Sequence, residues 1–82
     1  MNSPSLAGKR VLITGGGSGV GANMALAFAN AGAEVIITGR RLEALEQVAA
    51  QHSAIRSIAA DVTDEASVQG LFAAAGLVDI LI

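Results

Sequence analysis

The sequence predicts an α/β fold in which a parallel sheet carries helices on both of its faces. Short β-branched apolar segments alternate with amphipathic segments of helical period, and a glycine cluster separates the first strand from the first helix. Such alternation indicates successive β-α-β units with right-handed crossovers. Apolar residues make up 52% of the chain but include only two aromatic ones, which suits strands buried between helices.

Four strands are expected, each a short run of β-branched or aliphatic residues. They span residues 11–14, 34–38, 55–60 and 79–82. The first run has no polar alternation, so it is predicted to be buried on both faces. The third run, residues 55–60, gives the weakest indication of a strand among the four. The sequence ends within the fourth run, so we expect the chain to be the first half, βαβαβαβ, of a larger domain.

Three helices are expected between these strands. The first covers residues 19–30. The third is expected to begin at Thr63, whose hydroxyl would accept hydrogen bonds from free backbone amides, and to end at Gly76. The second and third helices carry apolar stripes at helical spacing. These stripes are Leu42, Leu45, Val48 and Ala49 in the second helix and Val68, Leu71, Phe72 and Ala75 in the third.

Composition narrows the possible functions. The 82 residues include no Cys and one His, so neither a disulfide framework nor a metal site is predicted. The net charge is −2 and the basic residues are scattered, which argues against a nucleic-acid partner. No apolar run approaches the ~20 residues of a membrane span, and the N-terminus lacks the features of a secretory signal. We therefore expect no membrane association and a cytoplasmic location.

The glycine cluster Thr14-Gly15-Gly16-Gly17-Ser18-Gly19-Val20-Gly21 lies between the first strand and the first helix. Glycines allow a tight turn and a close approach of backbone amides to a ligand, and the helix dipole favours an anion. A Walker A loop is excluded, because Ala22 and Asn23 stand where Lys and Ser or Thr are required. A plain linker, and for Ser18 a capping role, are the alternatives. The loop predicts a Rossmann-type doubly wound sheet that binds dinucleotide phosphates through Gly15, Gly17, Ser18, Gly19, Val20 and Gly21.

Four features stand at a characteristic mutual spacing. They are Leu6-Ala7-Gly8-Lys9 before the first strand, the Thr-Gly-x-x-x-Gly-x-Gly pattern of residues 14–21, Asp61-Val62 after the third strand, and residues 79–82. Together they resemble the N-terminal part of a short-chain dehydrogenase/reductase. The resemblance implies that Asp61 and Val62 lie at the adenine, although Asp61 could merely cap a turn. It also implies a reversal of strand order after the third strand, which would place the third helix on the opposite face, and a homo-oligomeric parent protein.

The end of the second strand bears on the choice between NAD and NADP. A fold that prefers NAD carries an acid about 20 residues past the glycine loop, whereas an arginine there accommodates the 2′-phosphate of NADP. This chain reads Thr38-Gly39-Arg40-Arg41. In the family that it resembles, an arginine at the place of Arg40 marks NADP preference. We therefore predict NADP, with NAD as the alternative, and phosphate contacts from Arg40 and Arg41; the competing interpretation is that both are solvated charges paired with Glu43 or Glu46.

The resemblance also implies a catalytic Tyr, a Lys four residues later, a Ser and an Asn. This chain contains no Tyr and its single Lys is Lys9, so no residue of it is assigned a catalytic role. We expect residues 1–82 to be the N-terminal, cofactor-binding part of an NADP-dependent oxidoreductase and to be inactive alone. The alternative is a non-catalytic module that binds a nucleotide or another protein.

Overall fold

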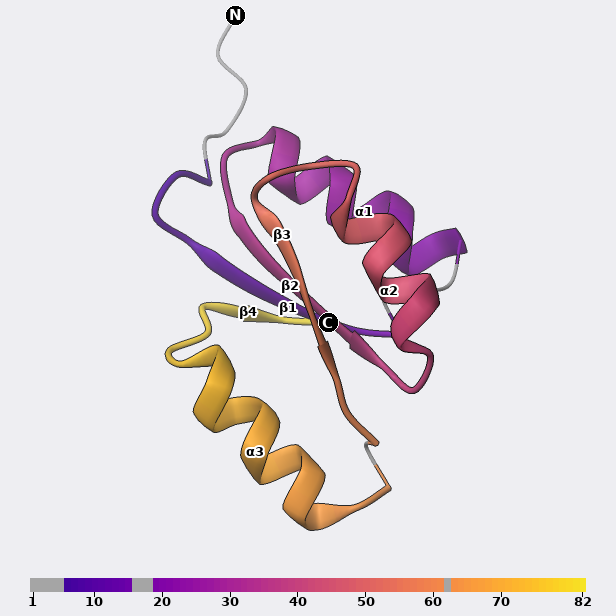
Figure 1. The fold of residues 1–82 in the computed structure, drawn as a ribbon. Coiled ribbons are helices and arrows are strands. Elements are labelled where there is room, and N and C mark those ends of the chain that lie inside the picture. Colours follow the sequence, from indigo (N-terminus) through magenta and orange to yellow (C-terminus); the bar gives the residue numbers. More distant parts are fainter. Residues whose placement is uncertain (1–5, 16–18, 62) are drawn as a thin grey trace, which may run out of the picture.

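The computed structural model describes residues 6–15, 19–61 and 63–82 of the chain (Figure 1). Strands and helices alternate along it, which confirms the predicted α/β class, and the strand ends differ from the predicted ones by single residues. None of the described helices is long and apolar enough to cross a membrane. The elements are β1 (Arg10–Thr14), α1 (Gly19–Asn30), β2 (Glu34–Gly39), α2 (Leu42–Ala49), β3 (Ile55–Ala59), α3 (Glu65–Ala75) and β4 (Ile80–Leu81).

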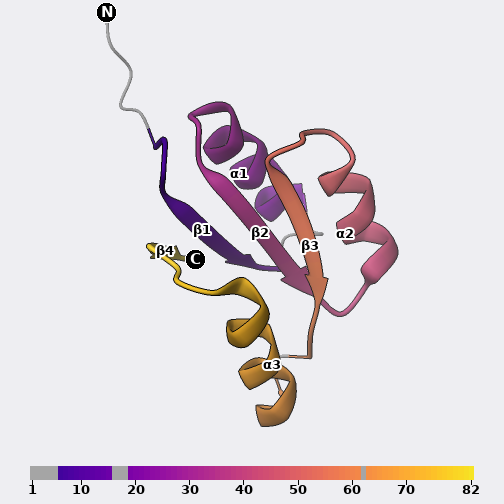
Figure 2. The ribbon, with the colours of Figure 1, turned by 60° about the vertical axis from the view of Figure 1, so that its left-hand side comes forward.

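The strands form one parallel sheet in the order β3-β2-β1-β4, which Figure 2 shows from one edge to the other. The strand order therefore reverses after β3, as expected for the first half of a doubly wound sheet. In the register, Thr14 at the end of β1 lies beside Thr38, and Gly39 at the end of β2 lies beside Ala59. The carboxyl ends of β1, β2 and β3 consequently lie at one edge, called the carboxyl edge below.

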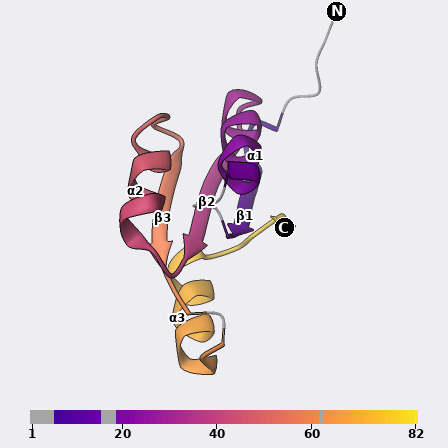
Figure 3. The same cartoon turned by 90° about the vertical axis from the view of Figure 1, so that its right-hand side faces the viewer.

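The two faces of the sheet bury separate cores. Helices α1 and α2 cover one face, and α3 lies apart from them on the other, as predicted (Figures 1 and 3). Alternate residues of β1 and β2 point to opposite faces, because side chains along a strand alternate. The α1–α2 face buries Val11, Ile13, Val35 and Ile37 with Ala25, Ala29, Leu45 and Val48, whereas the α3 face buries Leu12, Ile36 and Ala60 with Leu71 and Ala75.

For two residues of the predicted apolar stripes, the expected burial in the core is wrong. Leu42 is 47% exposed, because it stands in the first turn of α2 at the carboxyl edge. Phe72 is 43% exposed. Helix α3 contacts the sheet along the narrow strip of Leu71 and Ala75. Phe72 follows Leu71 and is therefore rotated by about 100° around the helix, away from this strip. The α3 face of the sheet is thus covered by a thinner layer than the sequence indicated.

Arg10 joins three elements at the opposite, amino-terminal edge of the sheet. Its Nη1 donates a hydrogen bond of 2.7 Å to the carbonyl oxygen of Ala75, at the end of α3. Its Nη2 lies 3.0 Å from Oε2 of Glu34 on β2, and Arg56 Nη2 of β3 lies 3.6 Å from the other Glu34 oxygen. A cation at the last carbonyls of a helix is favoured by the helix dipole. Arg10 therefore holds the carboxyl end of α3 against β1 and β2.

Gly76, which ends α3, is predicted to tolerate no side chain. Its φ of 75° and ψ of −147° lie near a region largely restricted to glycine, and an added Cβ would stand 2.7 Å from Arg10 Nη1. We expect Gly76→Ala to lower the free energy of unfolding by about 1–3 kcal/mol in urea denaturation.

Gly70→Ala is the matched control, because Gly70 lies inside α3 and an added Cβ would meet no atom within 4 Å. This substitution should raise the free energy of unfolding by roughly 0.5–1 kcal/mol, the usual gain of Ala over Gly in a helix. Equal effects of the two substitutions would show that Gly76 is not under conformational constraint.

Candidate dinucleotide-binding site

Backbone hydrogen bonds bring three strand ends together at the carboxyl edge. The amide of Gly15 donates to the carbonyl of Thr38 over 2.8 Å, and the amide of Ala60 donates to the carbonyl of Gly39 over 3.1 Å. Arg40 and Asp61 directly follow these paired positions. In parallel α/β sheets, ligands bind outside the carboxyl ends of the strands, where the strand order reverses. The sheet therefore brings Gly15, Arg40 and Asp61 to the edge where this fold binds its ligands.

The described part of the glycine cluster has the shape that close backbone approach requires. Gly15 turns the chain out of β1 with a φ of +73°, a conformation that glycine adopts without strain. At Gly19, which begins α1, an added Cβ would meet no atom of the described residues within 4 Å. Val20 is 74% exposed beside it, whereas Gly21 is buried in the helix. Among the described residues, no side chain therefore crowds the backbone at Gly19, while Gly17 and Ser18 lie outside the described residues.

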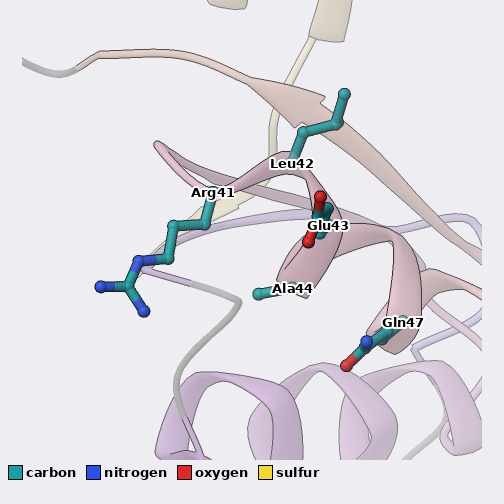
Figure 4. A pocket seen from close by; sticks show the side chains of 5 residues that line it. All are labelled: Arg41, Leu42, Glu43, Ala44 and Gln47. Atoms are coloured by element: carbon teal, nitrogen blue, oxygen red, sulfur yellow. The ribbon is translucent and has the colours of Figure 1, made fainter.

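The first turn of α2 lies at the carboxyl edge and adds a second candidate region for ligand binding. Arg41 is the N-cap residue of α2, and its side chain makes no capping hydrogen bond. An open hollow of about 590 Å³ lies there, lined by Arg41, Leu42, Glu43, Ala44 and Gln47 (Figure 4). The Arg41 side chain extends away from the body of the helix in this view. Uncapped amides at a helix start and a nearby guanidinium group favour an anion, although Glu43 opposes it.

Arg40 is exposed next to this hollow and makes a contact that the sequence did not reveal. Its Nη2 lies 3.4 Å from Oδ2 of Asp61, so the pair links the ends of β2 and β3. Within the described residues, Arg40 therefore pairs with Asp61 and not with Glu43 or Glu46, and no ion pair involves Arg41. Two predicted site residues are thus brought into direct contact.

Asp61 sits in a tight turn that fixes its carboxylate. Its Oδ1 accepts hydrogen bonds from the Thr63 amide (2.9 Å) and hydroxyl (2.6 Å), and its own amide donates to Ser67 Oγ over 3.0 Å. The Thr63 hydroxyl and amide, with a smaller contribution from Arg40, hold the pKa of Asp61 below its ordinary value of 3.8. Asp61 does cap a turn, as the alternative interpretation proposed, while Oδ2 stays directed at Arg40.

The predicted capping role of Thr63 is wrong. The N-cap residue of α3 is Asp64, whose Oδ1 accepts from the amide of Ala66 over 3.1 Å. Thr63 lies one residue too early and its hydroxyl donates to Asp61 instead. An Asp two residues before a Thr is a pattern typical of an Asx turn, and it could have indicated this arrangement. Val62 lies outside the described residues.

Comparison with known proteins identifies the family. The sequence pattern of the short chain dehydrogenases matches residues 9–82, nearly the whole chain. This chain belongs to the short-chain dehydrogenase family. It is 49% identical over 76 residues to the 2-keto-3-deoxy-L-fuconate dehydrogenase of Xanthomonas campestris, and 44% identical over 84 residues to the D-xylose 1-dehydrogenase of Caulobacter vibrioides. The alignment with the Xanthomonas enzyme covers 93% of this short-chain dehydrogenase chain and 25% of that relative. The alignment with the Caulobacter enzyme covers 96% of this chain and 34% of that relative.

Solved structures of short-chain dehydrogenases have the same fold. A 3-ketoacyl-(acyl-carrier-protein) reductase from Brucella melitensis, complexed with NADH, superimposes with a TM-score of 0.83 at 44% identity. The match covers 94% of this chain and 34% of the reductase. The glucose dehydrogenase of Caenorhabditis elegans, in its apo form, gives a TM-score of 0.86 at 35% identity, with 95% and 38% covered. The chain thus forms an oxidoreductase region with a nucleotide-binding fold and spans about a third of the length of these structures.

The turn around Asp61 predicts the effect of removing the Thr63 hydroxyl. We expect Thr63→Val to raise the pKa of Asp61 toward 3.8, because the largest stabilising hydrogen bond to the carboxylate is lost. NMR titration of the Asp61 carboxyl carbon measures this shift, and Thr63→Ser should keep the pKa low.

The same substitution should change how stability depends on pH. A pKa that is lower in the folded state stabilises the fold above the unfolded value, and this contribution is lost as the pH falls through the folded value. Between about pH 5 and about pH 3, the unsubstituted protein should therefore lose more stability than Thr63→Val. An unchanged pKa of Asp61 in Thr63→Val would contradict this account of the turn.

Proposed function

We propose that this chain binds NADP(H), in preference to NAD(H), as the adenosine-binding part of a cytoplasmic oxidoreductase. The observation that carries the proposal is the exposed Arg40 at the end of β2, directly after Gly39. A carboxylate at this place would bond the ribose hydroxyls of NAD and repel a 2′-phosphate. Here the acid is missing, and a guanidinium group offers donors matched to phosphate.

The remaining residues of the carboxyl edge support the same ligand. The open space at Gly19 accepts a pyrophosphate beside the start of α1, and the uncapped start of α2 with Arg41 adds positive potential near Arg40. We assign Asp61 to the adenine because of the family resemblance, since a carboxylate oxygen can accept a hydrogen bond from the adenine amino group. Gly17, Ser18, Val20, Gly21 and Val62 complete the proposed contacts.

The nicotinamide ring would accept or donate the hydride exchanged with a carbonyl or alcohol substrate. This chain holds and orients the adenosine half of the dinucleotide, and its residues supply no proton donor for the reaction. The proton donor and the substrate site would belong to the longer, oligomeric protein. Relatives that are three to four times as long support this assignment over a stand-alone binding module.

NAD remains the second candidate, since the Brucella reductase structure contains NADH. The experiment that separates the candidates is a pair of titrations of the purified protein with NADP and NAD. Arg40→Ala should weaken NADP binding by about tenfold to a hundredfold, because a charge-assisted contact contributes roughly 1.5–3 kcal/mol. The same substitution should leave NAD binding nearly unchanged.

Arg56→Ala is the matched control, because Arg56 is an exposed arginine of β3 that pairs with Glu34 at the amino-terminal edge. It removes the same charge away from the site and should spare the affinity for NADP. If the unsubstituted protein binds NAD and NADP equally, the assignment of Arg40 to the 2′-phosphate is wrong.

A further inference from the structure

The ion pair between Arg40 and Asp61 joins two residues that the proposed function assigns to different parts of one ligand. Arg40 Nη2 and Asp61 Oδ2 lie 3.4 Å apart, and their side chains are 71% and 41% exposed. Neither side chain belongs to the two cores. The pair lies at the surface of the carboxyl edge, where the proposed function places the adenosine phosphate.

The two partners differ in how firmly they are held. Asp61 is fixed by two hydrogen bonds from Thr63 to Oδ1 and by the bond from its own amide to Ser67. Only Oδ2 is left to face Arg40. Within the described residues, the Arg40 side chain pairs with Asp61 alone, and a long exposed side chain of this kind turns readily. A ligand that draws Arg40 away would therefore leave Asp61 in place.

We propose that Asp61 is a specificity-determining residue that competes with the 2′-phosphate of NADP for Arg40. This inference rests on the proposed function. With NADP, Arg40 must leave Asp61 for the phosphate, and the fixed carboxylate then stands close to a dianion. With NAD, Arg40 stays paired with Asp61. The competition lowers the affinity for NADP and leaves the affinity for NAD unchanged. Asp61 therefore reduces the preference for NADP over NAD that Arg40 creates.

The size of the effect follows from the exposure of the pair. Exposed ion pairs contribute little, so the preference should change by about twofold to fivefold. Dissolved salt screens exposed charges. The change in preference caused by Asp61 should therefore shrink as added salt shortens the Debye length below about 10 Å. Asp61 thus adjusts the preference without reversing it.

The test compares 2′,5′-ADP with 5′-AMP, which differ only in the 2′-phosphate and need no nicotinamide site. Asp61→Asn keeps an oxygen that accepts the Thr63 hydrogen bonds but removes the charge. We expect the affinity ratio of 2′,5′-ADP to 5′-AMP to rise about twofold to fivefold in this variant. Any lost adenine contact weakens both ligands and cancels in the ratio.

Two further variants separate the pair from general electrostatics. Glu65→Gln removes an equal charge in the first turn of α3, and no ion pair among the described residues involves Glu65. It should leave the ratio unchanged. In the Arg40→Ala background, Asp61→Asn should raise the ratio by less than it does alone, because the competition for Arg40 is gone and only the direct repulsion between Asp61 and the phosphate remains.

A measurement on the unsubstituted protein covers the case in which Asp61→Asn does not fold. Binding of 2′,5′-ADP should raise the pKa of the Asp61 carboxyl, because Arg40 leaves and a dianion arrives, whereas 5′-AMP should not. NMR titration of the carboxyl carbon reports this directly. A pKa that responds equally to both ligands would overturn the inference.

The outcomes distinguish this inference from the proposed function. If Arg40→Ala abolishes the preference for 2′,5′-ADP while Asp61→Asn leaves it unchanged, Asp61 does not compete and the proposed function stands. If Asp61→Asn and Glu65→Gln raise the ratio equally, the effect is general charge and the inference is overturned. If the unsubstituted protein shows no preference and Arg40→Ala changes nothing, both proposals are overturned.

Discussion

The structure depends on the parallel register of β1, β2 and β3. Backbone hydrogen bonds from Gly15 to Thr38 and from Ala60 to Gly39 make the three strands end together. Residues that are far apart in sequence, Gly15, Arg40 and Asp61, therefore emerge at the same edge. Since backbone groups make these bonds, the framework of the site does not depend on the side chains that select a ligand. This separation lets one fold accept different residues at the end of β2.

The two edges of the sheet use their charged residues differently. At the amino-terminal edge, Arg10 is engaged by Glu34 and by the carbonyl of Ala75, so its charge stabilises the packing of α3. At the carboxyl edge, Arg40 and Arg41 are exposed and the start of α2 has no side-chain cap. Groups without strong internal partners have more to gain from a ligand. Arg40 has one long contact with Asp61, and no ion pair among the described residues involves Arg41, so these weakly engaged charges fit the proposed binding role of the carboxyl edge.

Sequence periodicity predicted the elements, because short apolar runs and helical stripes are local properties of the chain, whereas the reversal of strand order followed from the resemblance to the family. The motif around Gly15, Gly19 and Gly21 indicated the ligand class, since it requires only local geometry. The same local reasoning failed for Thr63 and Phe72. The role of Thr63 depends on where the turn after β3 places Asp61, and the exposure of Phe72 depends on how α3 meets the sheet. The pair of Arg40 with Asp61 likewise requires the strand register, which no short pattern encodes.

The central claim is that the carboxyl edge binds the adenosine half of a phosphorylated dinucleotide. Amide chemical-shift mapping during titration with 2′,5′-ADP tests it directly, because it reports the location of binding without reference to activity. The account predicts the largest shifts at Gly15, Gly19, Arg40 and Asp61. The contradicting result would be shifts centred on the hollow at the opposite edge, which is lined by Gly8, Arg10, Glu34, Leu77 and Asp79.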